Sequence, residues 1–486
     1  MKNSFSGNAV LLLLISFGLL TSLDSKCKSC NHESGRPADG PQAAVKTGIS
    51  WWLTNADKSA LLQKQDSKLT FSTVANQHST IFVDPAITFQ EMDGFGIALT
   101  GGSAYLINKL APEILETLLK ELFLTEGNSI GISYLRISIG ASDLDASVFS
   151  YNDLPAGETD AELKKFSLAP DKVDLIPVLR SILKLNPGIK IMGSPWSAPV
   201  WMKSNKNSIG GSLLPEYYDA YARYFVRYIT EMKAEGIPID AITIQNEPLH
   251  PGNNPSMLML ATEQMNFIKN NLGPAFKSAG ITTKIVVYDH NCDHPEYATD
   301  ILSDPQAYQY VDGSAFHLYA GDISVLSKVH DAYPAKNVYF TEQWMGGPSK
   351  FGPDMKWFMQ NVIIGASRNW SKAVIEWNLA SDPLYDPHTP GGCTSCEGAI
   401  TISSGYTRNV SYYTLAHASK FVPAGSVRIA SNSVTTLPNV AFKTPDGRKV
   451  LIVLNNSDKA ETFNIGFDKK YATASLSGGA VATYVW

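Results

Sequence analysis

The chain has 486 residues, of which 44% are hydrophobic and 17% charged, a balance that predicts a large folded core and excludes a disordered protein. Its net charge of −5 gives no reason to expect nucleic acid or an anionic membrane as a partner, so we expect a neutral ligand. The length exceeds that of one ordinary domain, which favours a large barrel with an additional unit.

The first 26 residues have the pattern of an export signal. Lys2 supplies a positive charge, Ala9 to Leu20 is almost entirely apolar, and polar residues follow. An apolar stretch of about twelve residues is too short to span a bilayer as a helix. We therefore expect no transmembrane helix, and an exported protein that is secreted, periplasmic or held at the surface as a lipoprotein.

Residues 27 to 47 are expected to form a linker, because they are rich in Gly, Pro and Ala. Cys27 or Cys30 would carry the lipid of a lipoprotein. However, Asp24-Ser25-Lys26 differs from the small residues that normally precede a lipid-modified cysteine. Lipid anchoring and simple secretion both stay open.

Residues 48 to 89 contain short β-rich segments with one apolar face. The segments Ile49–Thr54, Leu69–Val74 and Thr80–Val83 are predicted strands. They are too few and too short to form a domain of their own.

Residues 90 to 420 alternate between β-rich runs and helix-like segments, which is typical of parallel βαβ units. The predicted strands are Asp93–Leu99, Ser133–Ile139, Lys190–Pro195, Ala241–Asn246, Lys284–Asp289, Gly313–His317, Val338–Thr341 and Ala373–Trp377. The predicted helices include Pro112–Phe123, Asp171–Leu185, Tyr217–Glu235, Ser256–Ala279 and Met355–Arg368. Eight strands in this pattern predict an α/β fold, the (β/α)8 TIM barrel.

Helical periodicity ends near residue 420, and residues 421 to 486 return to short strands. Asn439–Lys443 and Lys449–Asn455 flank the turn Asp446-Gly447, a strong hairpin signal, and Ala480–Trp486 ends the chain. We expect these strands and those of residues 48 to 89 to form one β-sandwich attached to the barrel.

Two of the predicted barrel strands lead into a glutamate. Glu247 follows strand four and Glu342 follows strand seven, and barrel enzymes build their sites at the carboxyl ends of the strands. Retaining hydrolysis of a glycosidic bond needs one carboxyl to protonate the leaving oxygen and a second, about 5 to 5.5 Å away, to attack the sugar. We predict that Glu247 is the acid/base and Glu342 the nucleophile. The alternative for either glutamate alone is a solvated loop residue or a helix cap.

Side chains that suit a sugar site lie at further strand ends, namely Arg136, Asp143, Trp196, Asn246, His317, Tyr319, Trp377 and Asn378. Asn246 is expected to bond a sugar hydroxyl, the tryptophans offer faces to a pyranose ring, and Arg136 would keep the nucleophile ionised. Glu247 needs a raised pKa in order to be protonated near neutral pH. The alternatives are a structural ion pair for Arg136, a core position for His317 and ordinary packing for the tryptophans.

Cys393 and Cys396 stand three residues apart, and Cys292 lies far from both. A redox pair, half of a zinc site and a small loop disulfide are the possible interpretations. No second Cys or His pair lies within zinc-finger distance of these two cysteines, and an exported protein meets oxidising conditions, which favours a disulfide. The sequence leaves the pairing of the two cysteines open.

Five motifs lie in order along the chain, and they are Ser194-Pro-Trp-Ser-Ala-Pro-Val-Trp-Met-Lys203, Gln245-Asn-Glu-Pro248, Phe316-His-Leu-Tyr319, Phe340-Thr-Glu-Gln-Trp344 and Glu376-Trp-Asn-Leu-Ala380. From about Trp51 to Trp486 the chain resembles glycoside hydrolase family 30, the glucosylceramidase family, whose bacterial and fungal branches include endo-β-1,6-glucanases. The resemblance implies the barrel, a sandwich built from both chain ends, a retaining mechanism and no metal or other cofactor. It also implies the roles given above for the two glutamates, and sugar contacts from the other eight residues.

The loop after Trp377-Asn378 departs from the animal glucosylceramidases, which resemble one another there in an Asn-Trp-containing loop. This chain has Asp386-Pro-His-Thr-Pro-Gly-Gly-Cys-Thr-Ser-Cys396, which is more similar to the β-1,6-glucanase branch. Our first hypothesis is therefore a monomeric endo-β-1,6-glucanase that acts through a covalent glycosyl-enzyme. The alternatives are a glucosylceramidase or β-glucosidase acting on glucosylceramide or small β-glucosides and, from another class, a non-catalytic surface glycan-binding protein.

Overall fold

A computed structural model describes residues 48–486 of the chain. The predicted export signal, the linker and both candidate lipid-bearing cysteines, Cys27 and Cys30, lie outside the described residues. Within residues 48–486, no helix combines the length and the apolar character needed to cross a membrane.

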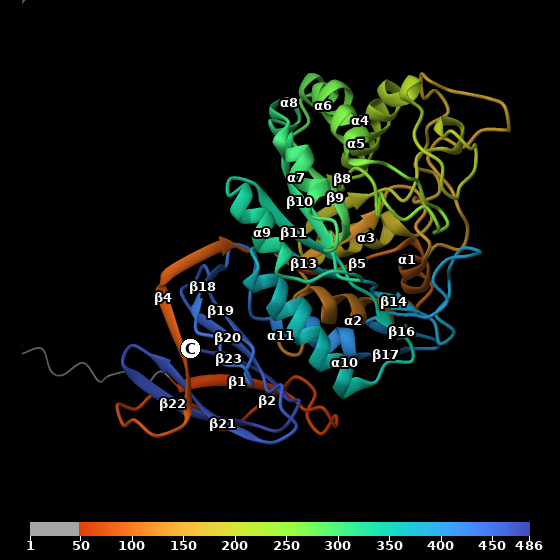
Figure 1. Cartoon of the computed structure of the whole chain (residues 1–486). Helices are drawn as coiled ribbons and strands as arrows, with labels where there is room; N and C mark the ends of the chain where they lie inside the picture. The colour runs from red at the N-terminus through yellow and green to blue at the C-terminus, as the bar shows by residue number, and fades with distance from the viewer. Residues whose placement is uncertain (1–47) are drawn as a thin grey trace, which may run out of the picture. The chain divides into compact units, whose positions relative to one another are not determined.

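Eight parallel strands form a closed barrel, as predicted (Figure 1). In chain order they are β5 (Gly94–Ala98), β6 (Tyr134–Ser138), β7 (Lys190–Ser194), β8 (Ala241–Thr243), β9 (Lys284–Asn291), β10 (Val311–His317), β11 (Asn337–Glu342) and β13 (Ser371–Glu376). Each strand pairs with its neighbours in sequence, and β13 closes the ring by pairing with β5. The predicted fourth strand is shorter than expected, because β8 ends at Thr243 rather than at Asn246.

The inward faces of the barrel strands change from apolar to polar toward the carboxyl ends. Buried residues from these strands form a separate core cluster that includes Tyr134, Met192, Ala241, Ala315 and Tyr339. Because side chains on one face of a strand recur every second residue, the residue two positions after each of these points the same way. Those residues are Arg136, Ser194, Thr243, His317 and Thr341. The apolar layer therefore supports a polar layer above it.

Helices connect successive barrel strands, and the last helix follows β13. They are α1 (Gly101–Asn108), α2 (Pro112–Phe123), α3 (Leu175–Leu185), α4 (Tyr218–Ala234), α5 (Ala261–Phe267), α6 (Gly273–Ala279), α7 (Glu296–Ser303), α8 (Pro305–Tyr308), α9 (Val325–Ala332), α10 (Phe351–Phe358) and α11 (Val410–Ser419). Segments of 3₁₀ geometry are η1 (Val200–Met202) and η2 (Pro215–Tyr217), and segments of π-helical geometry are η3 (Ile268–Leu272) and η4 (Met359–Ala366).

Three predicted helices differ from the observed ones at their starts by more than one residue. The helix expected from Met355 begins earlier, at Phe351. The helix expected from Ser256 begins only at Ala261, because the Glu263 carboxylate accepts the Leu260 backbone N–H at 2.7 Å and so caps the helix there. The helix expected from Asp171 begins at Leu175.

Strands from both ends of the chain share one ten-stranded sheet system, the predicted sandwich. Its strands are β1 (Gly48–Thr54), β2 (Gln63–Lys64), β3 (Leu69–Thr70), β4 (Ser79–Glu91), β18 (Val427–Ser431), β19 (Asn439–Lys443), β20 (Lys449–Leu454), β21 (Glu461–Phe467), β22 (Lys470–Leu476) and β23 (Val481–Val485). In Figure 1 the red β1 lies beside the blue β23, and Trp51 pairs with Tyr484 across them.

The terminal strands were predicted less completely than the barrel strands. Leu69–Val74 contributes only the two-residue β3, whereas β4 continues to Glu91, well past the predicted Val83. Strands β18, β21 and β22 were not predicted. Shorter strands lie outside the barrel and the sandwich, namely β12 (Met345–Gly346), β14 (Ala380–Ser381), β15 (Cys396–Glu397), β16 (Ile400–Ile402) and β17 (Tyr406–Arg408).

Helix α11 connects the barrel to the sandwich through a buried histidine. His417 Nδ1 lies 2.9 Å from Thr483 Oγ1 and its Nε2 lies 2.8 Å from Thr54 Oγ1. Burial lowers the pKa of His417 to about 3, so this histidine is neutral in the folded protein. One uncharged ring therefore joins strands from the two ends of the chain.

Candidate active site

Arg136 lies at the centre of the polar layer and is fully buried on β6. Its Nη1 donates to Glu342 Oε2 at 2.5 Å, and its Nη2 donates to Asn246 Oδ1 at 2.6 Å and to Asp289 Oδ2 at 2.8 Å. A guanidinium offers several donors in a fixed plane, so one side chain orients three others. The predicted contact between Arg136 and the nucleophile candidate is therefore present.

Asp289 is the buried anion that holds this layer together, and it was not among the predicted site residues. Its carboxylate accepts hydrogen bonds from Arg136 and from His317 Nε2 at 3.0 Å. It also accepts bonds from three hydroxyl groups, those of Ser194, Thr243 and Thr341. Burial alone would raise the pKa of Asp289, but Arg136 and the hydrogen bonds hold that pKa well below its ordinary value. Asp289 is therefore a permanent negative charge.

Glu342 ends β11 and points toward the centre of the barrel mouth. Besides the contact with Arg136, its Oε1 accepts a hydrogen bond from the Tyr319 hydroxyl at 2.9 Å. The Trp344 backbone N–H donates in turn to the Tyr319 hydroxyl at 3.1 Å. Both carboxylate oxygens of Glu342 are therefore held in place, as a nucleophile requires.

Glu247 is reached through an unusual backbone turn after β8. Its φ is +45°, in the left-handed region that non-glycine residues seldom adopt. Two hydrogen bonds hold the turn, from the Asn246 N–H to Pro195 O at 2.8 Å and from the Glu247 N–H to Asp289 O at 3.0 Å. The side chain then lies 3.2 Å from His317 Nδ1. Strain of this kind tends to occur at functional sites.

His317 lies between the acids and carries the proton of the site. Burial alone would lower its pKa, but the charge of Glu342 and the hydrogen bonds to Asp289 and Glu247 raise the pKa to about 9. At neutral pH the ring is therefore positively charged and donates from both nitrogens. A core histidine without function, the alternative considered from the sequence, would not need three acidic neighbours.

The expected order of the two glutamate pKa values is reversed. Burial raises the pKa of Glu342, and the charges of His317 and Arg136 oppose that rise only in part. Burial acts in the same direction on Glu247, but the hydrogen bond and charge of His317 outweigh it and lower the pKa of Glu247. The prediction of a raised pKa at Glu247 is thus wrong for the free protein. In the free protein the proton that Glu247 would donate is carried by His317, which is hydrogen-bonded to Glu247.

Trp196 and Trp377 form an apolar wall beside the acids. Their rings lie 5.2 Å apart between centroids, and the Arg136 guanidinium lies 4.9 Å from the centre of the Trp196 ring. Both tryptophans line the cavity. A ring that packs on one side and faces a cavity on the other can hold the apolar face of a sugar.

The side-chain oxygen of Asn246 accepts a hydrogen bond from Arg136. Because a guanidinium only donates, the Asn246 oxygen must face Arg136, and its Nδ2 group is left as a donor beside Glu247. This orientation suits a contact with a sugar hydroxyl next to the reacting carbon.

The site opens into a cavity of about 310 Å³. Of the predicted residues, those that line it are Asp143, Trp196, Asn246, Glu247, Tyr319, Glu342 and Trp377. The lining residues that were not predicted are His250, Asn253, His290, Asn291, Trp344, Cys393 and Cys396. His290 and Asn291 end β9, so the strand-end rule used above could have identified them.

Arg136, His317 and Asn378 are the predicted contacts that do not line the cavity. Arg136 and His317 hydrogen-bond the two glutamates, whereas Asn378 lies next to α1. It is fully buried, and its Oδ1 lies 3.4 Å from the Ser103 hydroxyl on α1. It does not line the cavity. Its role as a sugar contact stays a prediction without support from this geometry.

Asp143 lies on the loop after β6 and is buried at the edge of the cavity. Burial and the charge of Glu342 raise its pKa to about 7. The Cys393 backbone N–H donates to Asp143 Oδ2 at 3.2 Å. Cys393 and Cys396 form a disulfide, the interpretation favoured from the sequence, and within residues 48–486 the free cysteine is the buried Cys292.

Glu247, His317 and Glu342 are also the described residues that could hold a metal ion, since one ligand atom of each lies within 4.8 Å of the others. Arg136 already places a permanent positive charge 2.5 Å from Glu342. A second cation on the same carboxylate would be repelled by that charge. The expectation of a site without metal stays a prediction.

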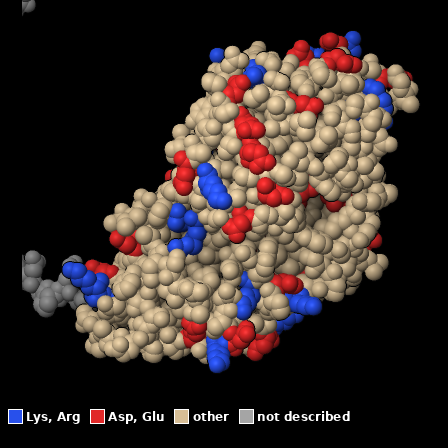
Figure 2. All heavy atoms as spheres, viewed as in Figure 1, with Lys and Arg blue, Asp and Glu red and all other residues tan. Residues whose placement is uncertain are grey.

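The surface seen in Figure 2 has acidic and basic residues mixed, with uncharged atoms between them. No large field of one sign covers this face. Such a surface gives no electrostatic advantage to a polyanion and suits a neutral ligand.

Comparison with known proteins agrees with this geometry. Residues 92–422 match the glycosyl hydrolase family 30 TIM-barrel domain, and residues 425–484 match the family's β-sandwich domain. An endo-1,6-β-D-glucanase of Aspergillus fumigatus is 35% identical over 393 residues, covering 75% of this chain and 78% of that protein. A lysosomal acid glucosylceramidase of Mus musculus is 29% identical, covering 83% of this chain and 82% of that protein. The solved endo-β1,6-glucanase BT3312 is 35% identical with a TM-score of 0.84, covering 90% of this chain and 99% of that one.

Proposed function

This chain belongs to glycosyl hydrolase family 30 and is a glycoside hydrolase, and from that premise we propose that it is a retaining endo-β-1,6-glucanase. Three similar proteins, each described as an endo-1,6-β-D-glucanase, are 34 to 35% identical over three quarters of the chain. The similar lysosomal glucosylceramidase is 29% identical. The balance of similarity supports β-1,6-glucan over glucosylceramide.

The observation that carries the proposed mechanism is the approach of the two glutamates. A carboxylate oxygen of Glu247 and one of Glu342 lie within 4.8 Å of each other. Inverting enzymes keep their carboxyl groups roughly 6.5 to 9.5 Å apart to admit a water, whereas retaining enzymes keep them about 5 to 5.5 Å apart. The short separation supports direct attack on the sugar.

In the first step Glu342 attacks the anomeric carbon, and the bond to the leaving oxygen breaks as that oxygen receives a proton. Arg136 and Tyr319 orient the attacking carboxylate. Asn246 Nδ2 bonds the neighbouring sugar hydroxyl, and Trp196 and Trp377 hold the ring. The product is a glycosyl ester on Glu342 and a shortened glucan.

The proton reaches the leaving oxygen from His317 through Glu247. When Glu342 becomes an ester it loses its negative charge, and that charge helps to raise the pKa of His317. The pKa of His317 then falls, which releases its proton to Glu247, 3.2 Å away. Proton donation is thereby coupled to bond formation at Glu342.

In the second step water displaces the sugar from Glu342. Glu247 accepts the proton of the attacking water, as microscopic reversibility requires of the same residue. The ester bond breaks, Glu342 regains its charge, and the pKa of His317 rises again. The site returns to its starting protonation.

Product analysis tests this function. Wild type should release short oligosaccharides from β-1,6-glucan and leave β-1,3-glucan and glucosylceramide intact. Glu342→Gln should release none. The matched control is Glu376→Gln, since Glu376 is a buried glutamate of the next barrel strand that bonds Thr414 and does not line the cavity.

The outcomes separate the hypotheses. Release of ceramide alone would identify a glucosylceramidase, and cleavage only of small aryl β-glucosides would identify a β-glucosidase. A protein that binds glucan but cleaves none of the substrates would be a glycan-binding protein, and its binding should be unchanged when both glutamates are replaced by glutamine.

We also propose export of the protein, on the basis of the apolar segment of residues 9 to 20. Expression with and without residues 1 to 26 tests this proposal. Intact mass would reveal cleavage of the signal or a lipid on Cys27 or Cys30, and an uncleaved chain retained in the cytoplasm would contradict export.

A further inference from the structure

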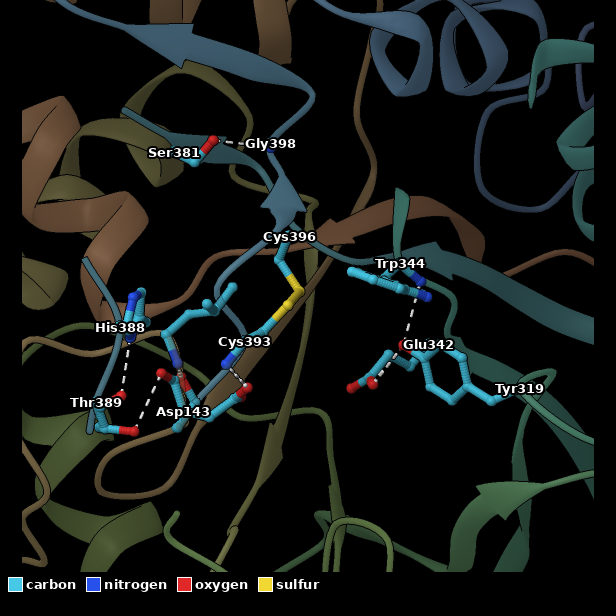
Figure 3. The surroundings of a disulfide bond; sticks show 12 residues. Asp143, Tyr319, Glu342, Trp344, Ser381, His388, Thr389, Cys393, Cys396 and Gly398 are labelled. Carbon is cyan, nitrogen blue, oxygen red and sulfur yellow. Dashed lines mark hydrogen bonds between the residues drawn. A yellow bond between two sulfur atoms is a disulfide. The ribbon is translucent and has the colours of Figure 1, made fainter. Parts of the chain in front are cut away.

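The disulfide Cys393–Cys396 is part of the wall of the cavity. Both cysteines line it, and Cys396 packs in an apolar cluster with Trp196 and Trp377. In Figure 3 the disulfide lies between Asp143 on one side and Trp344 and Glu342 on the other. Residues 386–396, here called the disulfide loop, therefore contact two sides of the same site.

On the first side, the disulfide loop holds Asp143 by its backbone and by its side chain. The Thr389 N–H donates to Asp143 O at 2.8 Å, and the Cys393 N–H donates to Asp143 Oδ2 at 3.2 Å. Gly392 permits this approach, because a Cβ atom there would lie only 2.5 Å from Asp143 O. The position of the Asp143 carboxylate thus depends on the path of the disulfide loop.

On the second side, the disulfide loop is paired with the segment that follows Glu342. Strand β15 runs antiparallel to β12, with Cys396 opposite Gly346. The Gly347 N–H also donates to Ser395 O at 2.7 Å. The four-residue turn Cys393–Cys396 is therefore hydrogen-bonded to Asp143 at its first residue and paired at its last residue with the segment that follows Trp344.

We propose that the Cys393–Cys396 disulfide is a positioning element of the sugar site. It fixes the Cys393 N–H under the Asp143 carboxylate and so orients Asp143 toward the sugar ring bound beside Glu342. The inference rests on the proposed function for the identity of that sugar. Without the covalent bond, Gly391 and Gly392 leave the disulfide loop free to take other backbone conformations. Asp143 then loses its fixed orientation, and substrate binds more weakly.

The test is a double-mutant cycle. One variant carries Cys393→Ser and Cys396→Ser together, one carries Asp143→Asn, and one carries all three changes. The serine pair should raise KM roughly tenfold with kcat within roughly threefold of wild type, because the loss concerns binding. In the Asp143→Asn background the serine pair should add little.

Two results would overturn the inference. Additive effects of the serine pair and Asp143→Asn on KM would mean that the disulfide does not act through Asp143. A serine pair with lower resistance to urea but unchanged KM and kcat would mean that the bond stabilises the fold alone.

Reduction provides the matched experiment on unmodified protein. Dithiothreitol transfers two electrons, becomes a cyclic disulfide and leaves two thiols at Cys393 and Cys396. Wild-type KM should rise to that of the serine pair, while dithiothreitol should leave the serine pair unchanged. Since that variant keeps every other cysteine, an equal response in both proteins would contradict the proposal.

The readouts separate this inference from the proposed function. If wild type cleaves an aryl β-glucoside but not β-1,6-glucan, the glucan proposal fails and the cycle is measured on the aryl glucoside. If it cleaves neither, hydrogen exchange of residues 140–146 is compared in wild type and the serine pair. Faster exchange in the serine pair supports the positioning role, and unchanged exchange overturns it.

Discussion

Replacement of Asp289 by Asn tests the proton relay most directly. The substitution keeps the shape of the side chain and removes its charge. Arg136 can only donate, so the remaining oxygen of the amide should face Arg136 and its NH₂ group should face His317 Nε2. An NH₂ group beside Nε2 favours the neutral ring. His317 should therefore lose its proton at a lower pH than in wild type.

The size of the effect follows from the pKa of His317. A rise from 6.5 to about 9 corresponds to about 3 kcal/mol of preference for the charged ring. This preference comes from three acidic neighbours, Glu342, Asp289 and Glu247. Loss of one of them should remove roughly a third to a half of this preference, which lowers the pKa of His317 by about 1.

The pH dependence has a defined sign. Activity that requires protonated His317 is present below its pKa and is lost as pH rises through it. The alkaline limb of kcat/KM should therefore lie near pH 9 in wild type and about 1 pH unit lower in Asp289→Asn. Looser orientation of Arg136 should also reduce kcat by about 100-fold.

The assay is hydrolysis of β-1,6-glucan from pH 4 to about 10, with unfolding in urea measured at the same pH values. The raised pKa of His317 stabilises the fold below the unfolded value of 6.5, and that stability is lost as pH rises through about 9. The matched control is Asp293→Asn, a nearby exposed aspartate. An alkaline limb that does not move in Asp289→Asn would refute the relay.

Three further changes probe the same structure. Glu247→Gln should lower kcat on glucan by about 10²- to 10⁴-fold but much less on an aryl glucoside whose leaving group needs no proton; equal losses on both substrates would contradict the acid role. Arg136→Lys should lower kcat/KM by about 100-fold, because an ammonium cannot hold Glu342, Asn246 and Asp289 together; retained activity would show that charge alone is sufficient. Burial lowers the pKa of His417 to about 3, so below pH 6.5 the unfolded chain binds a proton that the folded chain does not. The free energy of unfolding, measured in urea, should therefore fall by about 2 kcal/mol between pH 7 and 5. This fall should be absent in His417→Gln.

The barrel could be predicted because each strand carries its own signal. Runs such as Lys190–Ser194 and Asn337–Glu342 are short, apolar and bounded by turns, and their number alone identifies the closed ring. The strands of the sandwich were harder to predict. β21 and β22 mix polar and apolar residues because one face is exposed, and their partners lie hundreds of residues away or in a strand of equal ambiguity.

Within the site, the strand-end rule identified seven of the residues that line the cavity but not the buried charge beneath them. Asp289 ends a predicted strand like Glu342, yet nothing in the local sequence indicates that five donors converge on it. The reversed pKa order also lay beyond the sequence, because it depends on where His317 lies relative to both glutamates. Asn378 marks another limit, since it was predicted from its position in a motif but does not line the cavity.

The place of β23 in the sandwich has a consequence for how the protein acquires its structure. This last strand lies between β1 and β20, so the first and last strands of the described chain are hydrogen-bonded neighbours. During synthesis β1 has no partner on that side until residues 481–485 have been made, and contacts of such long sequence separation form slowly. Until then β1 and β20 present unpaired edges that invite association with other chains. Loss of β23 alone should therefore produce aggregation during biogenesis, even though every residue proposed to contact the sugar would still be present.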